Sequence, residues 1–431
     1  MSGRPPLPGG PYLVVGLARS GAGAMRMLAP HGEAIGVDAG SPSADLAGLE
    51  VHLGSDGLEL LDRVRTLVKS PGVPNEAPVV QAARARGIEV TGELELAWRL
   101  LPGARFVAVT GTNGKTTTTE LLGAIHRQAG VDVAVAGNVG TPLSALVDDP
   151  PGVVICEASS FQLEDTSRFA PDAALLLNLA EDHLDRHGTF AAYRDAKLRA
   201  FANQSEDDIA VLPLGFEPQP GGQARRVTFG APGADLAHEG GRLTWRGQPL
   251  MGTDEIRLRG AHNLENAMAA AAVALASGID PAPVRAALAT FAGVQHRLEE
   301  VAERDGVLYV NDSKATNVDA ARVGIEAFEP GTVHAILGGS LKGGGFTGLR
   351  PALTSRGRAA YLIGEAAERL AADLDGAVEL HRCGDLASAV AAARAAARPG
   401  DVVLLSPACA SYDQYANFEE RGEDFRRLSQ G

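Results

Sequence analysis

The stretch Phe106–Glu120, FVAVTGTNGKTTTTE, decides the fold of this chain of 431 residues. Its apolar start predicts a buried β-strand, and the Gly, Thr and Asn residues after it predict a loop that leads into a helix. Backbone N–H groups of such a loop and of the helix N-terminus converge on one point and bind phosphate. Lys115 would place a charge at the β- and γ-phosphates, and Thr116 a hydroxyl at Mg²⁺. The loop is shorter than the G-x-x-x-x-G-K-[ST] form, because Val109 stands where that pattern has its first glycine. A plain helix-capping turn would explain the glycines but not Gly-Lys-Thr directly after a strand.

Length and charge narrow the classes of protein that fit. A chain of this length is expected to form more than one domain. Its net charge of −14 disfavours nucleic acid or an anionic membrane as the main partner. No apolar run is long enough for a membrane span and the start has no signal-peptide core, so we expect a cytoplasmic protein. The three cysteines show no C-x-x-C spacing and predict neither a disulfide framework nor a zinc site.

Lysine is rare in this chain, which uses arginine for most of its 39 basic residues. Each lysine stands next to a distinctive local pattern, where a compact primary amine would be needed and a planar guanidinium would not serve. We treat these lysines as candidate functional residues: Lys69, Lys115, Lys197, Lys314 and Lys342.

The N-terminal part begins as a β-α-β unit. The run Tyr12–Val15 is followed by a glycine-containing turn and a small-residue helix, and a second strand ends at Asp38. The turn has Ala18 where dinucleotide-binding folds have a central glycine. Three interpretations stay open: a nicotinamide site, a site for another phosphate- or uridine-bearing ligand, and a plain packing turn.

The central part continues the α/β alternation after a boundary at Gly92 and Pro102-Gly103. The strand ending at Cys156 delivers Glu157 beside the phosphate loop, where a magnesium-supporting carboxylate belongs, although a helix-capping contact is the alternative. The next strand opens into the polar run Asn178–His187, and the three acids around His183 favour a site there. From residue 215 to 250, Gly, Pro and Arg predominate and predict turns with short antiparallel strands.

Three strands of the C-terminal third each end in a polar or glycine-rich loop. Because parallel strands present their carboxyl ends at one edge of a sheet, these loops predict a second ligand site. They begin after the runs Val307–Val310, Ala335–Leu337 and Val402–Leu405. We therefore predict an α/β protein of three domains, each built on a mostly parallel sheet: Rossmann-like at 1–94, P-loop ATPase-like at 95–296 and Rossmann-like at 297–431.

These motifs, taken together over nearly the whole chain, resemble the Mur ligase family. The resemblance rests on TGTNGKTT, Glu157, the run Asn178–His187, HNLEN, HRLE, NDSKATN and SPACASYDQYANFEERGEDF. The chain departs from the family pattern at Ala18, at Ala180 and at Gly343–Gly345 before Phe346.

The resemblance implies an ATP-dependent ligase of peptidoglycan precursor synthesis, and thus of cell shape and cell division. The last two motifs are those of members that add D-glutamate to UDP-N-acetylmuramoyl-L-alanine through an acyl phosphate. It also implies two Mg²⁺ ions, a carbamylated Lys197, and a monomer that binds neither nucleic acid nor membrane.

The resemblance assigns candidate site residues and gives the three predicted domains their ligands: the UDP-sugar, ATP and the amino acid, in chain order. The expected catalytic residues are Lys115, His183 and Lys197. ATP would be bound by Gly111, Thr112, Asn113, Gly114, Lys115, Thr116, Thr117, Asn266, Arg297 and Asp312. The UDP-sugar would be bound by Arg19, Ser20, Asp38, Ser70, Asn138 and His183. D-Glutamate would be bound by Lys314, Thr316, Lys342, Ser411 and Phe418. Mg²⁺ would be held by Thr116, Glu157, His183 and Lys197.

Other functions remain as alternatives. Another Mur ligase or a folylpolyglutamate synthase-like ligase would share the ATP motifs. An NAD-dependent oxidoreductase would rest on the N-terminal turn and Asp38, but it would leave the phosphate loop unused. A nucleotide-sensing module without catalysis would give Glu157, His183 and Lys197 no role.

Overall fold

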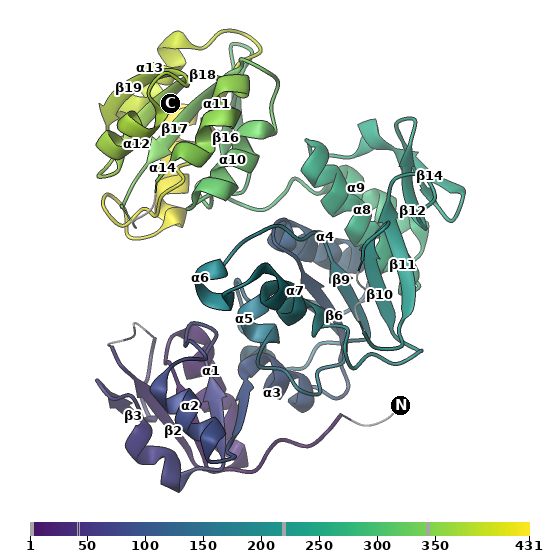
Figure 1. Ribbon diagram of the computed structural model, residues 1–431. Helices are drawn as coiled ribbons and strands as arrows, with labels where there is room; N and C mark the ends of the chain where they lie inside the picture. Colours follow the sequence, from purple (N-terminus) through teal and green to yellow (C-terminus); the bar gives the residue numbers. More distant parts are fainter. Residues whose placement is uncertain (1–3, 41, 43, 218–220, 342–344) are drawn as a thin grey trace. The chain divides into compact units, whose positions relative to one another are not determined.

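The computed structural model shows three α/β domains, each built on its own mostly parallel sheet (Figure 1). It describes residues 4–40, 42, 44–217, 221–341 and 345–431. The chain forms two compact units, Met1–Arg257 with Leu264–Phe291 and Leu258–Asn263 with Ala292–Gly431. The first two sheets belong to the first unit and the third sheet to the second. The predicted fold class is confirmed. Among the described residues, no helix has the length and apolar character needed to cross a bilayer.

The first sheet consists of parallel strands in the order β3-β2-β1-β4-β5. Its elements are β1 (Tyr12–Val15), α1 (Arg19–Leu28), η1 (Ala29–His31), β2 (Ala34–Asp38), β3 (Glu50–Leu53), η2 (Leu58–Arg63), β4 (Thr66–Lys69), α2 (Pro78–Ala85), β5 (Glu89–Gly92) and, after it, α3 (Glu93–Leu100). Strands β1 and β4 are buried throughout, which explains their continuous apolar runs. The strand order reverses between them, and open α/β sheets bind ligands beyond the carboxyl ends of strands at such a point.

The central sheet has the order β14-β13-β12-β11-β10-β9-β6-β8-β7, and Figure 1 shows β10, β11 and β12 continuing it from β9. Its elements are β6 (Arg105–Thr110), α4 (Lys115–Gln128), β7 (Val133–Gly137), η3 (Leu143–Leu146), β8 (Val153–Glu157), α5 (Ser160–Leu163), β9 (Ala173–Leu176), α6 (Leu184–His187), α7 (Phe190–Leu198), β10 (Ile209–Pro213), β11 (Arg225–Gly230), β12 (Leu236–Glu239), β13 (Arg242–Trp245), β14 (Gln248–Gly252), η4 (Thr253–Glu255), α8 (Ala261–Ala276) and α9 (Pro281–Thr290). Strand β6 lies between β8 and β9, with Val109 opposite Glu157 and Thr110 opposite Leu176. The loops that follow these three strands therefore meet at one edge.

The third sheet has the order β15-β16-β20-β17-β18-β19, in which the β15–β16 pair is antiparallel and the other pairs are parallel. Its elements are β15 (Glu299–Arg304), β16 (Val307–Asn311), α10 (Val318–Glu326), β17 (Val333–Gly338), η5 (Thr347–Leu349), α11 (Arg350–Arg356), β18 (Gly357–Ile363), α12 (Ala367–Leu374), β19 (Glu379–Gly384), α13 (Leu386–Ala396), β20 (Val402–Leu405) and α14 (Phe418–Gln430). Leu405 pairs with both Asn311 and Ile336, so the loops after β16, β17 and β20 leave the sheet together, as the sequence predicts.

The expectation for residues 215–250 holds in part. Strands β12, β13 and β14 pair antiparallel, as expected, but β11 pairs parallel with β10 and buries Val227 and Phe229 on one face. After the predicted boundary at Gly92 the structure has a helix that the sequence analysis did not predict, α3, whose acidic residues Glu93 and Glu95 are buried. Two buried acids in one short helix conceal the apolar face by which such a helix is recognised.

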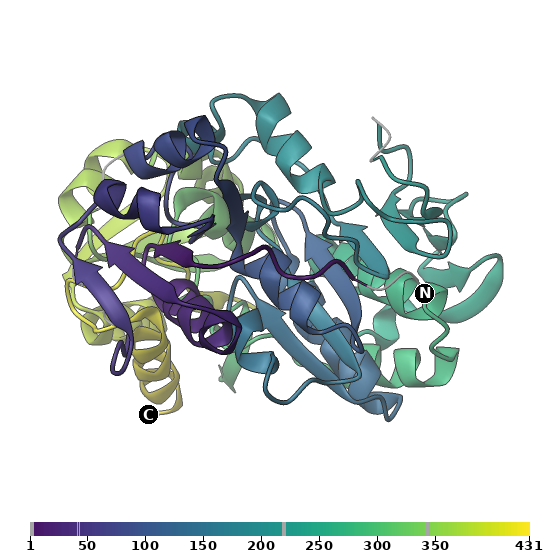
Figure 2. The ribbon, with the colours of Figure 1, turned by 90° about the horizontal axis from the view of Figure 1, so that it is seen from below.

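A single hydrophobic core joins the first two sheets. Tyr12 of β1, Trp98 of α3 and Phe106 of β6 belong to the same buried cluster. The chain before β1 also connects them (Figure 2), because the Arg4 guanidinium donates hydrogen bonds to the carbonyl oxygens of Trp98, Leu101 and Ala104. The first unit is therefore continuous across the predicted boundary between its two domains.

Candidate active site

The phosphate loop runs from the end of β6 to the start of α4. Gly111 (φ +152°) and Gly114 (φ +83°) have backbone conformations that favour glycine. At Gly114 a Cβ atom would lie 2.1 Å from the Asn266 side-chain oxygen. Asn266, a predicted ATP residue that is far from this loop in the sequence, thus lies directly against it.

The loop is held in shape by the strand beside it. The Asn178 side-chain oxygen, just beyond β9, accepts hydrogen bonds from the backbone N–H groups of Thr112 at 3.2 Å and Asn113 at 2.9 Å. The Asn178 amide nitrogen donates back to the Asn113 carbonyl oxygen at 3.1 Å. The sequence marked the run Asn178–His187 as a site, but it did not show that its first residue braces the phosphate loop.

Two lysines converge on one carbonyl oxygen of this loop. The Lys115 ammonium donates to the carbonyl oxygens of Gly111 and Thr112, each at 2.9 Å, and the Lys197 Nζ atom lies 2.7 Å from that of Gly111. The Lys197 side chain is 1% exposed. Burial, followed by the nearby charge of Lys115, lowers the pKa of Lys197 to about 6. At neutral pH, Lys197 is therefore mainly an uncharged amine.

Tyr193 is a site residue that the sequence reasoning missed. Its ring centroid lies 4.4 Å from the Lys197 Nζ atom, and its hydroxyl is 3.1 Å from the Thr112 hydroxyl. Burial raises the pKa of Tyr193 to about 12, which keeps its hydroxyl protonated. The available signal was its spacing, since i and i+4 residues share one face of a helix.

Glu157 and Asn138 meet beside the phosphate loop. Glu157 is 3% exposed, and its carboxylate accepts a hydrogen bond from the Asn138 side chain at 3.1 Å. The Asn138 backbone N–H donates to the Glu157 carbonyl oxygen at 2.9 Å. The structure thus brings together a predicted metal ligand and a predicted UDP-sugar residue.

His183 lies at the start of α6 in a left-handed conformation, with φ +52°. Its imidazole is half-exposed, lies 3.4 Å from the Asp182 carboxylate and contacts the Phe161 ring, with centroids 4.8 Å apart. Its ring centroid is 6.2 Å from that of Tyr193. His183, Tyr193, Lys197 and the phosphate loop thus form one neighbourhood.

The side chains predicted to hold Mg²⁺ differ in how well they suit that ion. In the described part of the chain, no three His, Cys, Asp or Glu side chains gather as a metal cluster. A buried carboxylate and a hydroxyl, as in Glu157 and Thr116, are oxygen ligands that suit Mg²⁺. An amine is a poor ligand for this ion, so Lys197 fits only if it carries an anionic group.

Predicted UDP-sugar residues shape the turn after β1. The Asp38 carboxylate accepts hydrogen bonds from the backbone N–H groups of Leu17 at 2.7 Å and Gly40 at 2.8 Å. The Ser70 hydroxyl donates to the Gly16 carbonyl oxygen at 2.6 Å. These side chains fix the turn on which a ligand would rest.

The same turn is connected to the loop after β7. The Arg19 guanidinium donates to the Gly140 carbonyl oxygen at 2.8 Å, and Ser20 hydrogen-bonds the buried Glu93 carboxyl. Arg19 therefore lies beside the loop that carries Asn138, so two of the predicted UDP-sugar residues belong to segments that touch.

In the second unit, Asp312 is fully buried at the end of β16. Its carboxyl accepts a hydrogen bond from the Ser406 hydroxyl at 2.7 Å and lies 3.6 Å from the Arg297 guanidinium. Burial raises the pKa of Asp312 to about 6, against the opposing effect of Arg297. The residues on either side of Arg297 have left-handed backbone conformations, with φ +59° at His296 and +47° at Leu298. This strained backbone fixes the direction in which the Arg297 side chain leaves the chain.

Among the predicted D-glutamate residues, Lys314, Thr316 and Ser411 lie on loops, and Phe418 begins α14. The backbone N–H of Lys314 donates to the His296 carbonyl oxygen at 3.0 Å, and that of Thr316 to Lys314 at 2.9 Å. The Phe418 carbonyl oxygen accepts from the Ser313 hydroxyl at 2.8 Å. Ser411 is buried, and its carbonyl oxygen accepts hydrogen bonds from two backbone N–H groups of the turn after β20. Lys342 lies outside the described residues.

Arg421, on α14, is the hub of these loops and was not singled out by the sequence. Its guanidinium is 1% exposed and bonds all three loops. The acceptors are the Ser313 hydroxyl at 3.0 Å and the carbonyl oxygens of Ser313 at 2.9 Å, Cys409 at 3.1 Å, Ala410 at 3.3 Å and Gly338 at 3.4 Å. One side chain thus sets the spacing of all three loops.

Replacing this hub is expected to destabilise the second unit. An Arg421→Met variant would leave several buried carbonyl oxygens without a donor, at a cost of about 2–4 kcal/mol in the free energy of unfolding. Chemical denaturation followed by far-UV circular dichroism measures this change. The matched control is Arg427→Met, because Arg427 lies on the same helix with a side chain 71% exposed. Equal stabilities of the two variants would contradict the role assigned to Arg421.

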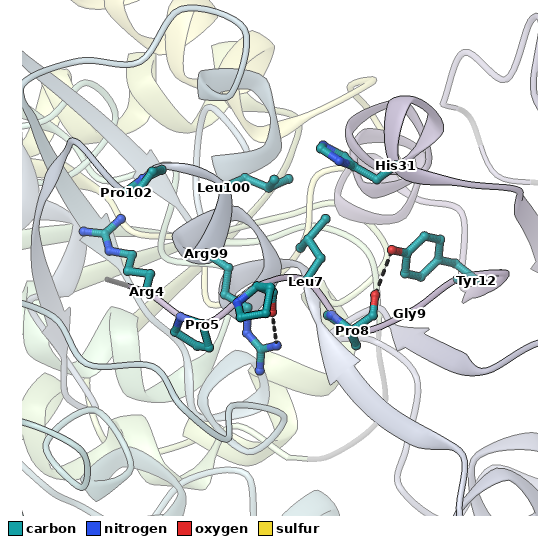
Figure 3. Close-up of a pocket in the computed structure, with 12 residues that line it drawn as sticks. Arg4, Pro5, Leu7, Pro8, Gly9, Tyr12, His31, Arg99, Leu100 and Pro102 are labelled. Atoms are coloured by element: carbon teal, nitrogen blue, oxygen red, sulfur yellow. Dashed lines mark hydrogen bonds between the residues drawn. The ribbon is translucent and has the colours of Figure 1, made fainter. Parts of the chain in front are cut away.

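A separate cavity of about 490 Å³ lies between the N-terminal segment and the end of α3 (Figure 3). Figure 3 shows the Tyr12 hydroxyl bonded to the Pro8 carbonyl oxygen at its wall. Arg99 also lines it and forms an ion pair of 2.8 Å with the buried Glu95. No predicted site residue is among the residues lining this cavity, so the candidate active site lies elsewhere.

Comparisons with known families match the chain in three segments. The family described as Mur ligase MurD-like, N-terminal domain, matches residues 11–92. The Mur ligase middle domain matches residues 109–274, and the Mur ligase, glutamate ligase domain, matches residues 296–409.

Curated relatives match nearly the full length of the chain. A protein of Acidobacterium capsulatum named UDP-N-acetylmuramoylalanine–D-glutamate ligase is 45% identical, and the match covers 98% of this chain and 96% of the relative. A protein of the same name from Anaeromyxobacter dehalogenans is 44% identical, with 99% of this chain and 98% of the relative covered.

Solved structures share the fold at low sequence identity. Thermotoga maritima MurC, a UDP-N-acetylmuramate–alanine ligase, has a TM-score of 0.62 at 19% identity. The match covers 97% of this chain and 99% of the MurC chain. T. maritima MurF ligase in complex with ADP has a TM-score of 0.60 at 20% identity, with 92% of this chain and 95% of its own covered. These structures support the fold alone.

Proposed function

Because the chain belongs to the Mur ligase family, we propose that it is the ATP-dependent ligase that joins D-glutamate to UDP-N-acetylmuramoyl-L-alanine in peptidoglycan precursor synthesis. The match to relatives of that name over almost the whole chain carries the proposal. The described geometry agrees with it, because Arg421 unites the two segments that favour D-glutamate, one near Ser313 and the other near Cys409.

The reaction consists of two transfers. A carboxylate oxygen of UDP-N-acetylmuramoyl-L-alanine attacks the γ-phosphorus of ATP, and the bond to the β-phosphate oxygen breaks to release ADP. The D-glutamate amine then attacks the acyl carbon, loses a proton and expels phosphate. The first transfer is needed because a free carboxylate is a poor electrophile. Both transfers gather negative charge, so the enzyme must supply fixed positive charge and N–H donors.

The phosphate loop supplies these groups. The N–H groups of residues 111–117 and the Lys115 ammonium would bind the β- and γ-phosphates, while Asn266 would bind the nucleotide from the opposite side of Gly114. Thr116 with Glu157, and His183 with Lys197, would hold two Mg²⁺ ions. Bound there, the ions would neutralise phosphate charge and orient the reacting oxygens. In the second unit, Arg297 and Asp312 would contact ATP, and Lys314, Thr316, Lys342, Ser411 and Phe418 would surround D-glutamate.

We also propose that Lys197 is carbamylated. Its amine is buried, and it is mainly unprotonated at neutral pH, so its nitrogen lone pair can add to CO₂. Formation of the N–C bond releases one proton and leaves an anionic carbamate. The product would convert a poor ligand into an oxygen ligand that suits Mg²⁺.

The test of function is phosphate release from ATP with UDP-N-acetylmuramoyl-L-alanine and a panel of D- and L-amino acids. We expect turnover with D-glutamate and little with L-glutamate, L-lysine or meso-diaminopimelate. Turnover with another amino acid would identify a different Mur ligase, and turnover with a folate and L-glutamate a folylpolyglutamate synthase-like enzyme. No ATP turnover with any acceptor would refute the proposal, and a thermal shift produced by NAD alone would then favour the oxidoreductase.

The three predicted domains would each bind one of the ligands. We propose that residues 1–94 bind the UDP-sugar, 95–296 bind ATP and 297–431 bind the amino acid. We further propose that the protein works in the cytoplasm as a monomer.

A further inference from the structure

A buried ion-pair ring connects the turn after β4 to the segment that carries His183. Its centre is Lys69, whose side chain is 0% exposed. The Lys69 ammonium lies 3.0 Å from the Glu164 carboxylate, 2.9 Å from the Asp165 carboxylate and 3.0 Å from the Val73 carbonyl oxygen. Its three N–H groups are therefore matched by three acceptors from two separate parts of the chain.

Arg186 closes the ring from a third part of the chain. Its guanidinium donates to the same Glu164 oxygen at 2.8 Å and to the same Val73 carbonyl oxygen at 2.7 Å. It also lies over the Phe161 ring, 5.0 Å from the centroid. The Val73 carbonyl oxygen thus accepts from both Lys69 and Arg186, and a shift of either cation would move the turn.

Both ends of the ring continue into proposed ligand sites. At one end, the Ser70 hydroxyl bonds the Gly16 carbonyl oxygen, and a Cβ atom on Gly16 would lie 2.8 Å from the Val73 side chain. At the other end, the Arg186 backbone N–H donates to the His183 carbonyl oxygen at 3.1 Å. A continuous chain of bonds therefore runs from the glycine turn of the first sheet to His183.

Stability alone does not account for this arrangement. Removing two charges from water costs free energy that their attraction recovers only in part, and apolar residues of similar size often replace a buried ion pair without loss. Asp165 shows this cost directly, because burial raises its pKa to about 6 despite the neighbouring Lys69. What apolar side chains cannot replace is the directed bonding of two cations to one carbonyl oxygen.

We propose that Lys69 and Arg186 are positioning residues, which fix the turn of Ser70 and Val73 relative to His183. This inference rests on the proposed function, in which the turn binds the UDP-sugar and His183 acts in phosphoryl transfer. The ring would hold the acceptor carboxylate in line with the γ-phosphate, and a misplacement of about 1 Å can lower a rate about 100-fold.

The decisive variant is Lys69→Met/Asp165→Leu in the full-length protein, since it removes one cation and one anion together. We expect the unfolding free energy to stay near that of the wild type. We expect kcat to fall on the order of tenfold and the KM for the UDP-sugar to rise, with the dissociation constant for ATP unchanged. Unchanged kcat and KM in this folded variant would overturn the inference.

Arg186→Met changes the ring at a second place, where the side chains of Arg186 and Glu164 are 13% and 12% exposed, so water can reach the carboxylate that loses its partner. It should lower kcat to a similar extent. A variant that combines Lys69→Met, Asp165→Leu and Arg186→Met should lose no more kcat than either of the two variants alone, since the effects of changes within one network are not additive. Backbone hydrogen exchange at residues 184–187 should become faster in each variant. Additive losses, or unchanged exchange, would show that the ring does not act as one positioning unit.

The matched control is Arg99→Met, which breaks another buried pair of the same unit. The side chains of Arg99 and Glu95 are 7% and 0% exposed, and neither contacts the turn or α6 in any described bond. This variant should lose stability but keep both KM values and kcat within about twofold, because no described bond of Arg99 reaches Lys69, Arg186 or Val73. A loss of kcat equal to that of the ring variants would count against the inference. An inactive wild-type enzyme would instead refute the proposed function.

Discussion

A Lys115→Ala variant is expected to lose at least about 10³-fold in kcat while its melting temperature stays close to that of the wild type. Removing one cation that faces a transferred phosphoryl group typically costs this much. The Lys115 side chain is partly exposed and bonds two carbonyl oxygens of its own loop, so its removal creates no core cavity. Phosphate release, together with differential scanning fluorimetry, measures both quantities.

Two companion variants sharpen this test. Lys115→Arg keeps the charge but replaces a point donor with a planar fork, so it should also be strongly impaired. Arg127→Ala changes an exposed residue at the other end of α4 and should remain active. Near-normal turnover in Lys115→Ala would show that residues 111–116 do not bind the phosphates of ATP.

The second large effect is expected at Lys197, where both Lys197→Arg and Lys197→Ala should be nearly inactive. Arginine keeps a positive charge that would repel Mg²⁺, and it does not form the carbamate. Alanine leaves a space beside Tyr193, where a short carboxylic acid such as acetate can place an oxygen ligand. High acetate should therefore restore part of the activity of Lys197→Ala and none of that of Lys197→Arg. Full activity of Lys197→Arg would remove the carbamate from the mechanism.

The carbamate also predicts a pH dependence with a definite sign. Only the uncharged amine adds CO₂, and the pKa of Lys197 is lowered to about 6 rather than raised. The carbamate should therefore persist at pH 7 to 8 and be lost as the pH falls through about 6. Carbon-13 NMR with labelled bicarbonate follows the adduct directly, with Lys197→Arg as the blank. An adduct that formed only near pH 10 would indicate an exposed lysine of ordinary pKa.

The parts of the candidate site that can be located from the sequence are those that lie in single segments. The phosphate loop, Glu157 after β8 and the three loops of the third sheet follow from apolar runs and what comes after them, because parallel strands end at one edge. The roles of Asn178, Tyr193 and Arg421 were missed because they depend on partners brought near by folding. Arg421 lies within the motif SPACASYDQYANFEERGEDF, yet nothing in the residues around it shows that it bonds Ser313 and Gly338.

Lys69 was marked by the sequence, but its contacts also depend on partners brought near by folding. Lysine is rare in this chain, which marked Lys69 as a candidate functional residue. The sequence around it does not show which groups its ammonium contacts. Its partners Glu164 and Asp165 lie in the turn after α5, between strands β8 and β9 of the central sheet. A long side chain at the end of a buried strand can be a ligand contact or an internal tie, and only the position of the opposing acids decides between them.

The position of Arg421 near the C-terminus affects the order in which the parts of the chain can fold. Protein synthesis proceeds from the N-terminus, and domains generally fold as they emerge from the ribosome. All three loops that Arg421 joins precede it, since they follow β16, β17 and β20. A nascent chain stalled before α14 would have completed every strand of its third sheet without the group that spaces the loops. The phosphate loop after β6 would thus form early in translation, whereas the loops after β16, β17 and β20 would reach their final spacing only once α14 has emerged.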